Sequence, residues 1–557
     1  MTKIFSKYIF ILLIFSQFIG HSKTYSFNSA EIKNLPARDL FDALNKLSTL
    51  HGLSYGRTGQ ITQVKALGKD QYNAQIYVND IPVSNFNSGI SNLSTLSLDR
   101  IDNIIIDDSP INNSSTSIYI YTKKYEINEP ITEMIYRDAF FNHRNISMHL
   151  GQNFSKNSSF LLYADITDYM DYRESSDNAF KYPYQRQNYN LQVKLPEIFS
   201  VQPSIEFSYL KENIYDFPLD STLYKPETYQ WVLNLNSTSS GFIDNKISLI
   251  NSFRSDQFDP ENSNLTILNQ FTYNDSINLF KLKTQFEFYE HLTHRGESAF
   301  SLEPSYQKNF IFLNTNFNSY IRYSDFTDFT YSAGAELIKQ LPWGFEINSE
   351  HSIFAGSYRM LDDIIDVEFI QNEFYLENVF TFYSFSGSIY TGIDIIEYQK
   401  NRSDTFTGYL SSGIKQYSKS KLDLKILEHI NLNIDYSHKI SSNISINDPN
   451  STIISSLNFT DRYFNDNLHI SATVLHKYSD FYTSVNNREI INDLGFNLRG
   501  RILDVEIFFG INNIMKNKYE INNNTYILNE HYTYQTIEGY DMQRFDEIWG
   551  VRWIFRY

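Results

Sequence analysis

Apolar and polar residues alternate along most of the chain from about Pro130 onward. Side chains of an extended strand point alternately to opposite faces, so such runs predict strands with one apolar and one polar face. Clear runs occur at 281–289, 311–323, 422–436 and 503–511. In the first of them, Phe286 and Phe288 fall on the face opposite Glu287. The pattern predicts a long series of antiparallel strands.

The C-terminal run, WGVRWIFRY at 549–557, alternates without a break. One face carries the large apolar residues Trp549, Val551, Trp553, Phe555 and Tyr557, and the other carries Gly550, Arg552, Ile554 and Arg556. An edge strand of this kind in a soluble protein would promote aggregation, whereas a strand that closes a membrane barrel leaves no free edge. We therefore expect this strand to pair with the first barrel strand, near residues 132–141.

Strand length separates two architectures that use alternating strands. A soluble β-sandwich or solenoid has strands of about 5 or 6 residues, whereas these runs reach roughly 9 to 15, enough for a tilted strand to cross a membrane. Short connections at 155–157, 307–309 and 341–344 interleave with long polar ones at 168–187 and 516–544. This asymmetry is typical of outer-membrane barrels. Residues 129–557 are predicted to form a transmembrane antiparallel β-barrel of about 22 strands, wide enough to require a plug.

The N-terminus predicts export. Lys3 and Lys7 precede an apolar run at 9–19, and small residues follow at Gly20 and Ser22, as in a signal peptide cleaved near Ser22. A membrane anchor is the alternative, but it needs roughly 20 apolar residues and this run is about half that length. Residues 1–22 are therefore predicted to be a signal peptide.

Residues 23–128 have a different pattern from the barrel. Apolar residues recur at helical spacing after Pro36, at Leu40, Phe41, Leu44, Leu47 and Leu50, and Gly52 follows as a natural helix stop. Short apolar runs come next, at 75–83, 93–98, 100–107 and 117–124. The sequence predicts a small α+β domain at 23–128 that would occupy the barrel as a plug.

Composition narrows the class of protein. The chain has no cysteine, so disulfides and cysteine-based metal or nucleophile sites are excluded. Mean hydropathy is -0.39, and after the signal peptide no apolar run is long enough for a membrane-spanning helix. Aromatic residues make up 16% of the chain, which suits a lipid-facing surface with aromatic girdles. The net charge of -17 argues against a nucleic-acid partner.

Several segments resemble the TonB-dependent receptor family. The run SAEIKNLPARDLFDAL at 29–44 resembles the first helix of that family's plug, and IYVNDIPV at 76–83 resembles its V-x-V-D-G-x-P strand and turn. The runs LDRIDNIIIDDSP at 98–110 and SIYIYTKK at 117–124 are similar to its I-E-R-I-E-V-x-x-G-P and G-x-I-N-I-x-T-K segments. NNIMKNKY at 512–519 is similar to the N-L-F-x-x-x-Y element after the penultimate barrel strand. These resemblances follow the family's order across both domains.

The chain also departs from the family pattern. Asp80 and Ser109 replace turn glycines, which predicts less freely bent loops. The plug-like residues begin almost at the predicted cleavage site. We therefore expect no clear TonB box, the extended strand that the family adds to the sheet edge of its energising partner. Residues 24–27 are the remaining candidate for a minimal version.

No catalytic, cofactor or metal motif is present. The 12 histidines and many Asp and Ser residues include no H-E-x-x-H, G-x-S-x-G, P-loop or G-x-G-x-x-G spacing. The polar clusters at 290–295 and 428–429 alternate with apolar residues or fall at strand ends, which predicts lumen or loop positions rather than ligands. We therefore expect no enzyme activity and no cofactor.

The resemblance implies uptake of a scarce extracellular solute across the outer membrane of a Gram-negative bacterium, energised by an inner-membrane TonB-type protein. A structural or surface-binding barrel with a vestigial plug is the alternative. Tyr-rich segments at 168–184 and 519–540 could contact a ligand or extend an interfacial aromatic girdle, so the ligand-binding residues stay unknown. Expected partners are the outer-membrane lipid bilayer and the barrel-assembly machinery, which would recognise the aromatic C-terminus.

Overall fold

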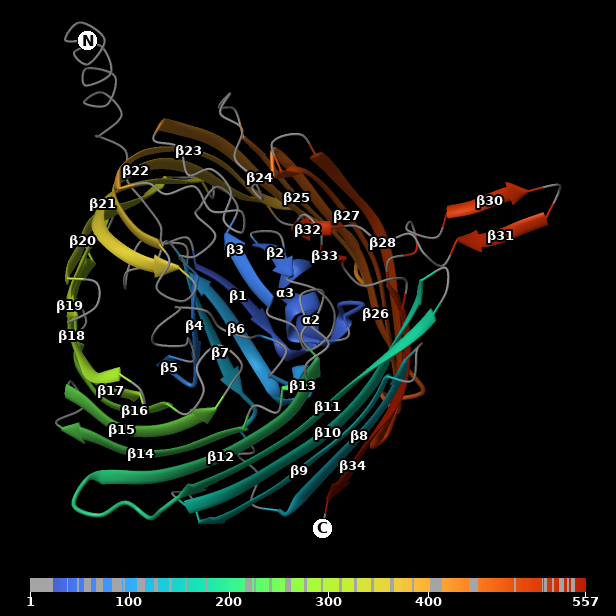
Figure 1. Cartoon of the computed structure of the whole chain (residues 1–557), viewed down its shortest axis with the longest axis horizontal. Helices are drawn as coiled ribbons and strands as arrows, with labels where there is room; N and C mark the ends of the chain where they lie inside the picture. Colours follow the sequence, from blue (N-terminus) through green and yellow to red (C-terminus); the bar gives the residue numbers. More distant parts are fainter. Residues whose placement is uncertain are drawn as a thin grey trace, which may run out of the picture.

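The computed structural model places an N-terminal unit inside a closed ring of strands (Figure 1). The structure describes residues 24–37, 39–47, 50–54, 62–66, 74–82, 93, 96–107, 116–124, 129–139, 143–155, 158–175, 178–215, 223–224, 227–239, 243–255, 262–274, 278–291, 294–309, 313–324, 328–341, 345–360, 365–382, 385–400, 413–439, 449–484, 487–512, 514, 518–522, 525–529, 535–537, 540–541 and 546–556. The predicted signal peptide, 1–22, lies outside these residues, as do Ser109 and Tyr557.

The N-terminal unit, called the plug below, comprises the described part of residues 24–124. Its helices and strands are β1 (Thr24–Asn28), α2 (Ser29–Asn34), α3 (Leu40–Asn45), β2 (Leu50–Ser54), β3 (Thr62–Ala66), β4 (Ala74–Val78), β5 (Ile81–Pro82), the 3-10 helix η3 (Leu98–Arg100), β6 (Ile101–Asp107) and β7 (Thr116–Thr122). A five-stranded mixed sheet has the order β1-β6-β7-β4-β5, and β2 pairs with β3 separately.

The apolar core of the plug continues onto the wall residues Phe481 and Ile491. Leu40, Leu44 and Leu50 are fully buried against the sheet residues Ile104 and Ile118. A capping box starts α2: the Asn28 side chain accepts from the Glu31 backbone N–H at 3.1 Å, and the Asn28 N–H donates to Glu31 Oε2 at 2.8 Å. The predicted α+β character of this region is therefore confirmed.

The predicted single helix starting at Pro36 is wrong. Pro36 lies between α2 and α3, and its carbonyl accepts a hydrogen bond from Lys46 Nζ. Leu50 and Gly52 belong to strand β2, where the Gly52 N–H donates to Asn45 Oδ1 at 2.8 Å. A Cβ at residue 52 would come within 2.8 Å of Phe41, so Gly52 permits close packing of β2 on α3 and does not end the helix.

The turn that follows β4 contains no glycine. Asp80, which replaces a family glycine, adopts the left-handed conformation that glycine favours, with φ of 69°, and Asn79 has φ of 51°. The Asn79 side chain is fixed by Thr122, whose N–H donates to Oδ1 at 3.1 Å, and Asp80 accepts from the Tyr121 hydroxyl at 2.9 Å. Neighbouring strand β7 thus stabilises a turn without glycine.

The remaining described residues form a closed antiparallel barrel of 22 long strands, which confirms the predicted fold class and strand number. The strands are β8 (Ile131–Ala139), β9 (His143–Ser155), β10 (Ser158–Ser175), β11 (Asn178–Lys194), β12 (Val201–Tyr215), β14 (Glu227–Ser239), β15 (Ile243–Ser255), β16 (Asn262–Asn274), β17 (Asn278–His291), β18 (His294–Asn309), β19 (Leu313–Ser324), β20 (Asp328–Leu341), β21 (Phe345–Met360), β22 (Ile365–Phe382), β23 (Phe385–Lys400), β24 (Gly413–Leu427), β25 (Ile430–Lys439), β26 (Ser451–Tyr463), β27 (Leu468–Ser484), β28 (Asn487–Ile502), β29 (Val505–Asn512) and β34 (Asp546–Arg556). The two-residue β13 (Leu223–Tyr224) also pairs with β12.

The C-terminal strand closes the barrel as predicted. β34 pairs antiparallel with β8, with Trp553 opposite Met134 and Phe555 opposite Thr132. Its other neighbour is β29, with Trp549 opposite Phe509. Both edges of the sheet are therefore paired, which removes the free edge that an aromatic terminal strand would otherwise present.

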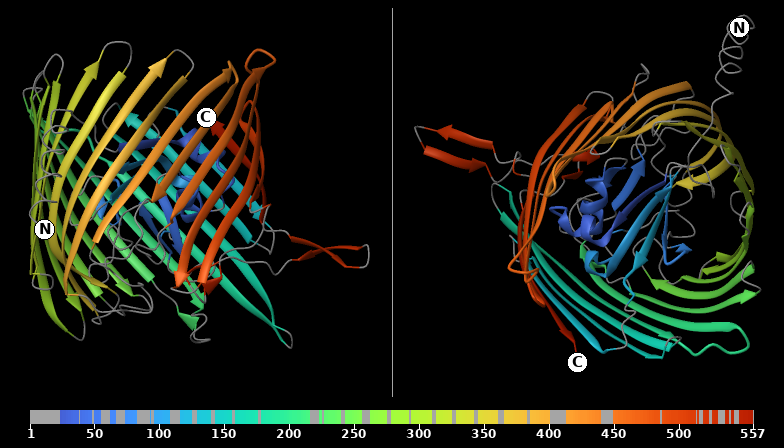
Figure 2. Two further views of the ribbon diagram at one scale, coloured as in Figure 1. Left: turned by 90° about the horizontal axis from the view of Figure 1, so that it is seen from above. Right: turned by 180° about the vertical axis from the view of Figure 1, so that it is seen from behind.

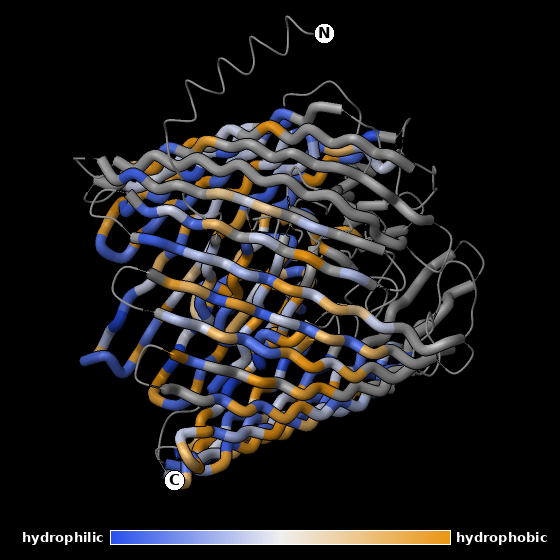
Figure 3. Tube along the Cα trace, turned by 90° about the vertical axis from the view of Figure 1, so that its left-hand side faces the viewer, coloured by the Kyte–Doolittle hydropathy of each residue, from blue (hydrophilic) through white to orange (hydrophobic). Residues whose placement is uncertain are grey.

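The wall separates apolar and polar side chains as the alternation predicts. Phe286 and Phe288 are exposed on the outer surface, whereas the intervening Glu287 is buried on the inner side. Figure 3 shows hydrophobic and hydrophilic positions alternating along the wall strands. Among the described residues, no helix has the length and apolar character needed to cross a membrane.

Connections at the end of the barrel where β8 begins and β34 finishes are called the turn end; the opposite end is the loop end. At the turn end, residues 428–429 join β24 to β25, and residues 503–504 join β28 to β29. Of the predicted turns, 307–309 belongs to β18, whereas 156–157 and 342–344 lie outside the described residues. The predicted loop at 168–187 is wrong, because β10 and β11 form one long hairpin there.

Residues 422–436 form two strands rather than one. They span the end of β24, the turn at 428–429 and the start of β25. The hairpin pairs Leu424 with Leu432 and Leu422 with Ile434, so even-numbered residues share one face on both strands. Alternation therefore continues through the turn and gives no sign of it. Similarly, Leu503 lies in the turn before β29, with φ of 54°.

Candidate functional site

The two Tyr-rich segments, which could contact a ligand or extend an aromatic girdle, do not form one site among the described residues. Residues 168–184 lie in the β10–β11 hairpin. Within 519–540, β30 (Lys518–Asn522) and β31 (Thr525–Asn529) form a hairpin that extends away from the barrel, as Figure 2 shows. β32 (Gln535–Ile537) pairs with β33 (Tyr540–Asp541) and contacts β2 of the plug and β27. Ligand contacts in these segments stay a prediction.

The predicted polar clusters occupy strand ends. The backbones of His291 and His294 pair where β17 meets β18. His429 lies in the β24–β25 turn, with its Nδ1 3.3 Å from Asp461 Oδ1. Among the residues that the structure describes, no group of three or more His, Cys, Asp or Glu side chains could hold a metal ion.

The main polar site is an ion-pair chain where the plug meets the closing strands. Lys123, which follows β7, donates to Glu133 Oε1 of β8 at 2.9 Å, and Arg552 Nε of β34 donates to the same oxygen at 2.6 Å. Arg552 Nη1 also donates to Glu506 Oε2 of β29 at 3.0 Å, and Glu506 pairs with Arg499 of β28. One chain of charges therefore joins the plug to four wall strands.

Positive charge accumulates at this junction. Burial lowers the pKa of Lys123, although Glu133 opposes that shift. Burial, together with the nearby charges of Lys123 and Arg552, lowers the pKa of Lys33 in α2 to about 7. The Lys33 carbonyl accepts from Asn497 Nδ2 and Arg499 Nε, each at 2.9 Å. α2 is thus held against β28 at a site crowded with cations.

The 3-10 helix η3 forms a second attachment. Asp99 pairs with Arg137 of β8, and its other oxygen accepts from Ser147 Oγ of β9 at 3.3 Å. Arg100 Nη2 donates to Glu206 Oε1 of β12 at 2.9 Å. All these side chains except Glu206 are at most 9% exposed, so water screens the contacts weakly. The segment resembling the I-E-R-I-E motif therefore anchors the plug to three wall strands.

A third attachment involves α2, α3 and the strands β27–β29. Lys477 Nζ donates to Asn45 Oδ1 at 2.6 Å, and Asn512 Nδ2 donates to Asp42 Oδ2 at 2.8 Å. Ser471 Oγ donates to Asn34 Oδ1 at 3.1 Å. Polar and ionic contacts of this kind can exchange partners with water, so they suit an interface that holds the plug reversibly better than a purely apolar one would.

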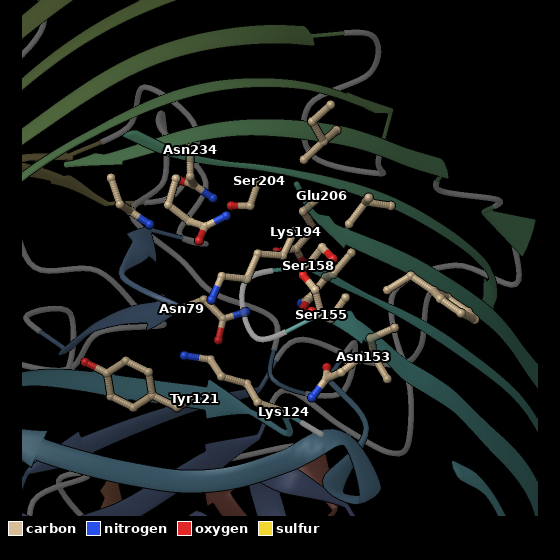
Figure 4. A pocket seen from close by; sticks show the side chains of 18 of the residues that line it. Asn79, Tyr121, Lys124, Asn153, Ser155, Ser158, Lys194, Ser204, Glu206 and Asn234 are labelled. Atoms are coloured by element: carbon tan, nitrogen blue, oxygen red, sulfur yellow. Dashed lines mark hydrogen bonds between the residues drawn. The ribbon is translucent and has the colours of Figure 1, made fainter. Parts of the chain in front are cut away.

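A cavity of about 830 Å³ lies between the plug and the wall at the turn end. The plug contributes Asn79, Asp80, Tyr121 and Lys124, and the wall contributes residues of β9, β10, β11, β12 and β14. Figure 4 shows Lys124 and Lys194 extending into this space beside Asn79. Serine hydroxyls and amide side chains form most of the remaining labelled lining.

Sequence reasoning placed Arg552 on the polar face but identified no partners for it. Asp99, Arg100 and Lys123 fall within the family-like runs at 98–110 and 117–124, and Glu506 falls on the polar face of the run at 503–511. Charged residues at inward positions of the alternating strands were the available signal. Their pairing depends on how strands distant in sequence surround the plug.

Comparisons with known proteins bear on the fold. No family model matches the chain, and no curated protein sequence matches it. Solved structures do match closely in three dimensions. A mutant of the ferric enterobactin receptor PfeA from Pseudomonas aeruginosa has a TM-score of 0.74 at 10% identity, covering 96% of this chain and 98% of that one.

Two further structures agree. The siderophore receptor PirA from Acinetobacter baumannii has a TM-score of 0.73 at 10% identity, covering 97% of this chain and 99% of that one. The FrpB iron transporter from Neisseria meningitidis has a TM-score of 0.70 at 11% identity, covering 97% of this chain and 100% of that one. The chain therefore has the plug-and-barrel fold of TonB-dependent receptors.

Proposed function

We propose that this protein is an outer-membrane receptor that takes up a scarce solute through its plugged barrel. The observation that carries the proposal is the plug itself, enclosed by 22 strands and attached to the wall through buried ion pairs and polar contacts as well as apolar ones. A barrel of this width would be an open pore without the plug. A structure that is closed but reversibly held suits gated uptake of one solute.

The outer surface supports a membrane location. Large apolar side chains such as Trp231, Phe300 and Phe317 are more than 40% exposed on the wall strands, a costly arrangement in water and a favourable one in lipid. We assign residues 1–22 to a signal peptide, 23–128 to the plug and 129–557 to the barrel. On this assignment the turn end faces the periplasm and the loop end faces the exterior.

Energy for plug movement would come from an inner-membrane TonB-type partner. Residues 24–28 form β1, the edge strand of the plug sheet, paired with β6 from Thr24 opposite Asp107 to Asn28 opposite Asn103. An edge strand can add a partner's strand, and pulling on β1 would transmit force directly to β6. One edge of β1 is already paired with β6, so β1 is not a free extended segment. This pairing also favours the alternative, a structural barrel whose plug is not pulled.

A pull-down separates these two functions. The mature chain, purified in detergent, is incubated with the periplasmic domain of the TonB-type protein from the same organism. We compare it with a Ser26→Pro variant, because proline removes a backbone donor from β1. Retention that the variant abolishes supports energised uptake. If the unaltered chain is not retained, and hydrogen exchange shows that its plug is folded, the result supports the structural alternative.

Conductance tests the plug independently of the partner. In planar bilayers the full chain should stay closed, and the barrel lacking residues 23–128 should conduct strongly. Because the chain has no native cysteine, Asn34→Cys with Ser471→Cys offers a clean reversible tether between plug and wall. Solute uptake that stops under oxidation and recovers after reduction supports plug movement. Equal conductance with and without the plug contradicts the proposal.

A further inference from the structure

We infer that the cavity at the turn end is a binding site for a small, multiply anionic ligand that carries carboxylate or phosphate groups. Its volume of about 830 Å³ is within the range of small-molecule sites. The site lies on the plug's periplasmic side in the proposed orientation, apart from the loop end where a solute would be captured. It is therefore additional to the proposed uptake function.

Two lysines give the cavity its preference for anions. Lys124 comes from the plug and Lys194 from the end of β11, and both line the cavity. Neither ammonium group pairs with any residue that the structure describes. Figure 4 shows them reaching the same space from opposite sides, beside the Asn79 amide. A ligand with two anionic groups could pair with both, and each contact would be a charge-assisted hydrogen bond.

The acidic residues of the lining are engaged elsewhere. Glu206 accepts from Arg100 Nη2 at 2.9 Å and from Asn190 Nδ2 at 2.6 Å. Asp80 accepts from the Tyr121 hydroxyl at 2.9 Å. With Glu206 paired to Arg100, the remaining charged groups of the lining are the two lysines and the Asp80 carboxylate, so the cavity keeps a net positive charge that an entering anion would offset.

Neutral donors complete the site. The side-chain nitrogen of Gln192, which lines the cavity, is buried without a hydrogen-bond partner among the described residues. Leaving a buried donor unsatisfied is costly, and a bound acceptor would relieve that cost. The Ser204 hydroxyl lies around the same space, as do those of Ser155 and Ser158, which are 2.7 Å apart; Ser204 and one hydroxyl of that pair can donate to further ligand oxygens.

The ligand would bridge two bodies. Lys124 and Asn79 belong to the plug, whereas Lys194 and Gln192 belong to the barrel wall. An anion held by both sides would strengthen their attachment and slow release of the plug. The site therefore links plug position to binding of an anion, which is either a periplasmic anion or an anionic solute leaving the barrel toward the periplasm.

Calorimetric titration of the full mature chain in detergent tests this inference at fixed ionic strength. The probes are citrate, inorganic pyrophosphate and the neutral sugar maltotriose. Citrate or pyrophosphate should bind, and Lys124→Gln or Lys194→Gln should each weaken that binding about tenfold. Lys425→Gln is the matched control, because Lys425 is an exposed lysine outside the cavity. Preference for citrate identifies a carboxylate ligand, and preference for pyrophosphate identifies a phosphate ligand.

Hydrogen exchange supplies a second readout. The bound anion should increase protection of amides in β7 and the 79–80 turn, and the two cavity variants should lose this effect. Binding of maltotriose alone, equal weakening by all three variants, or no anion binding would each overturn the inference. Since both cavity lysines are exposed, the variants should fold. A difference in gel migration between heated and unheated samples would verify that each barrel is folded.

Discussion

Lys123 of the plug and Glu133 of β8 form a 2.9 Å ion pair at the strand with which the C-terminus closes the barrel. Arg552 of the closing strand donates to the same Glu133 oxygen. Glu133 is 1% exposed, so one buried carboxylate connects the plug, the first barrel strand and the last. Plug attachment and barrel closure are consequently linked at a single residue.

Glu133→Gln should destabilise the protein strongly. The variant leaves Lys123 without its carboxylate partner and takes one carboxylate from Arg552, and an uncompensated buried charge costs roughly 3 to 5 kcal/mol. Urea unfolding followed by tryptophan fluorescence measures the change. Glu129→Gln is the control, because Glu129 is exposed just before β8. Equal stability of the two variants would show that the buried pairing contributes little.

Lys33 should make stability depend on pH. Its pKa is lowered from 10.5 to about 7 in the folded protein, so between these values the unfolded chain binds more protons than the folded one. Stability should therefore rise as pH increases from about 7 to about 10. Lys33→Met should flatten that part of the profile. Thermal unfolding of both proteins across this range checks the prediction, and parallel profiles would contradict it.

Gly495→Ala should loosen the plug and leave the barrel intact. A Cβ on residue 495 would lie 2.6 Å from Pro36 Cγ, so the segment between α2 and α3 would have to move. Overpacking of this kind typically costs about 1 to 3 kcal/mol. Hydrogen exchange should show faster exchange in α2 and α3. Gly500→Ala on the same strand is the control, since nothing lies within 4 Å of its Cβ position.

Replacing Phe555 and Tyr557 with serine should impair insertion into the outer membrane. Phe555 is 42% exposed on the outer face of the closing strand, where lipid contact favours an aromatic side chain. Membrane fractionation should find the variant chain in the periplasm. Arg556→Gln tests whether any change in this strand has the same effect. Normal insertion of the double serine variant would show that assembly does not depend on the aromatic terminus.

Strand positions and faces were predictable because a barrel wall imposes one local rule on every strand, apolar outward and polar inward. The same rule hides turns. Leu424 and Leu432 face each other across the β24–β25 hairpin, and their shared parity makes two strands look like one. The β10–β11 hairpin was missed for the opposite reason, because its tip mixes Tyr with charged residues and resembles a loop.

The helix starting at Pro36 was overextended for another reason. Leu47 and Leu50 keep an apolar spacing because they enter the same core, whatever the backbone does between them. Gly52 is required because Phe41 approaches it closely. This requirement comes from a tertiary contact and not from the backbone preference of glycine for helix ends. Periodicity reports which residues are buried, and it reports the backbone conformation less directly.

The sequence by itself determined the membrane barrel, the plug region and the closing role of the C-terminal strand, because alternation, strand length and aromatic content are local properties of the chain. Only the tertiary structure decided that Lys123, Glu133 and Arg552 share one charge network, and that Lys124 meets Lys194 across a cavity. Those contacts join residues far apart in sequence, and their positions depend on how a closed wall surrounds the plug.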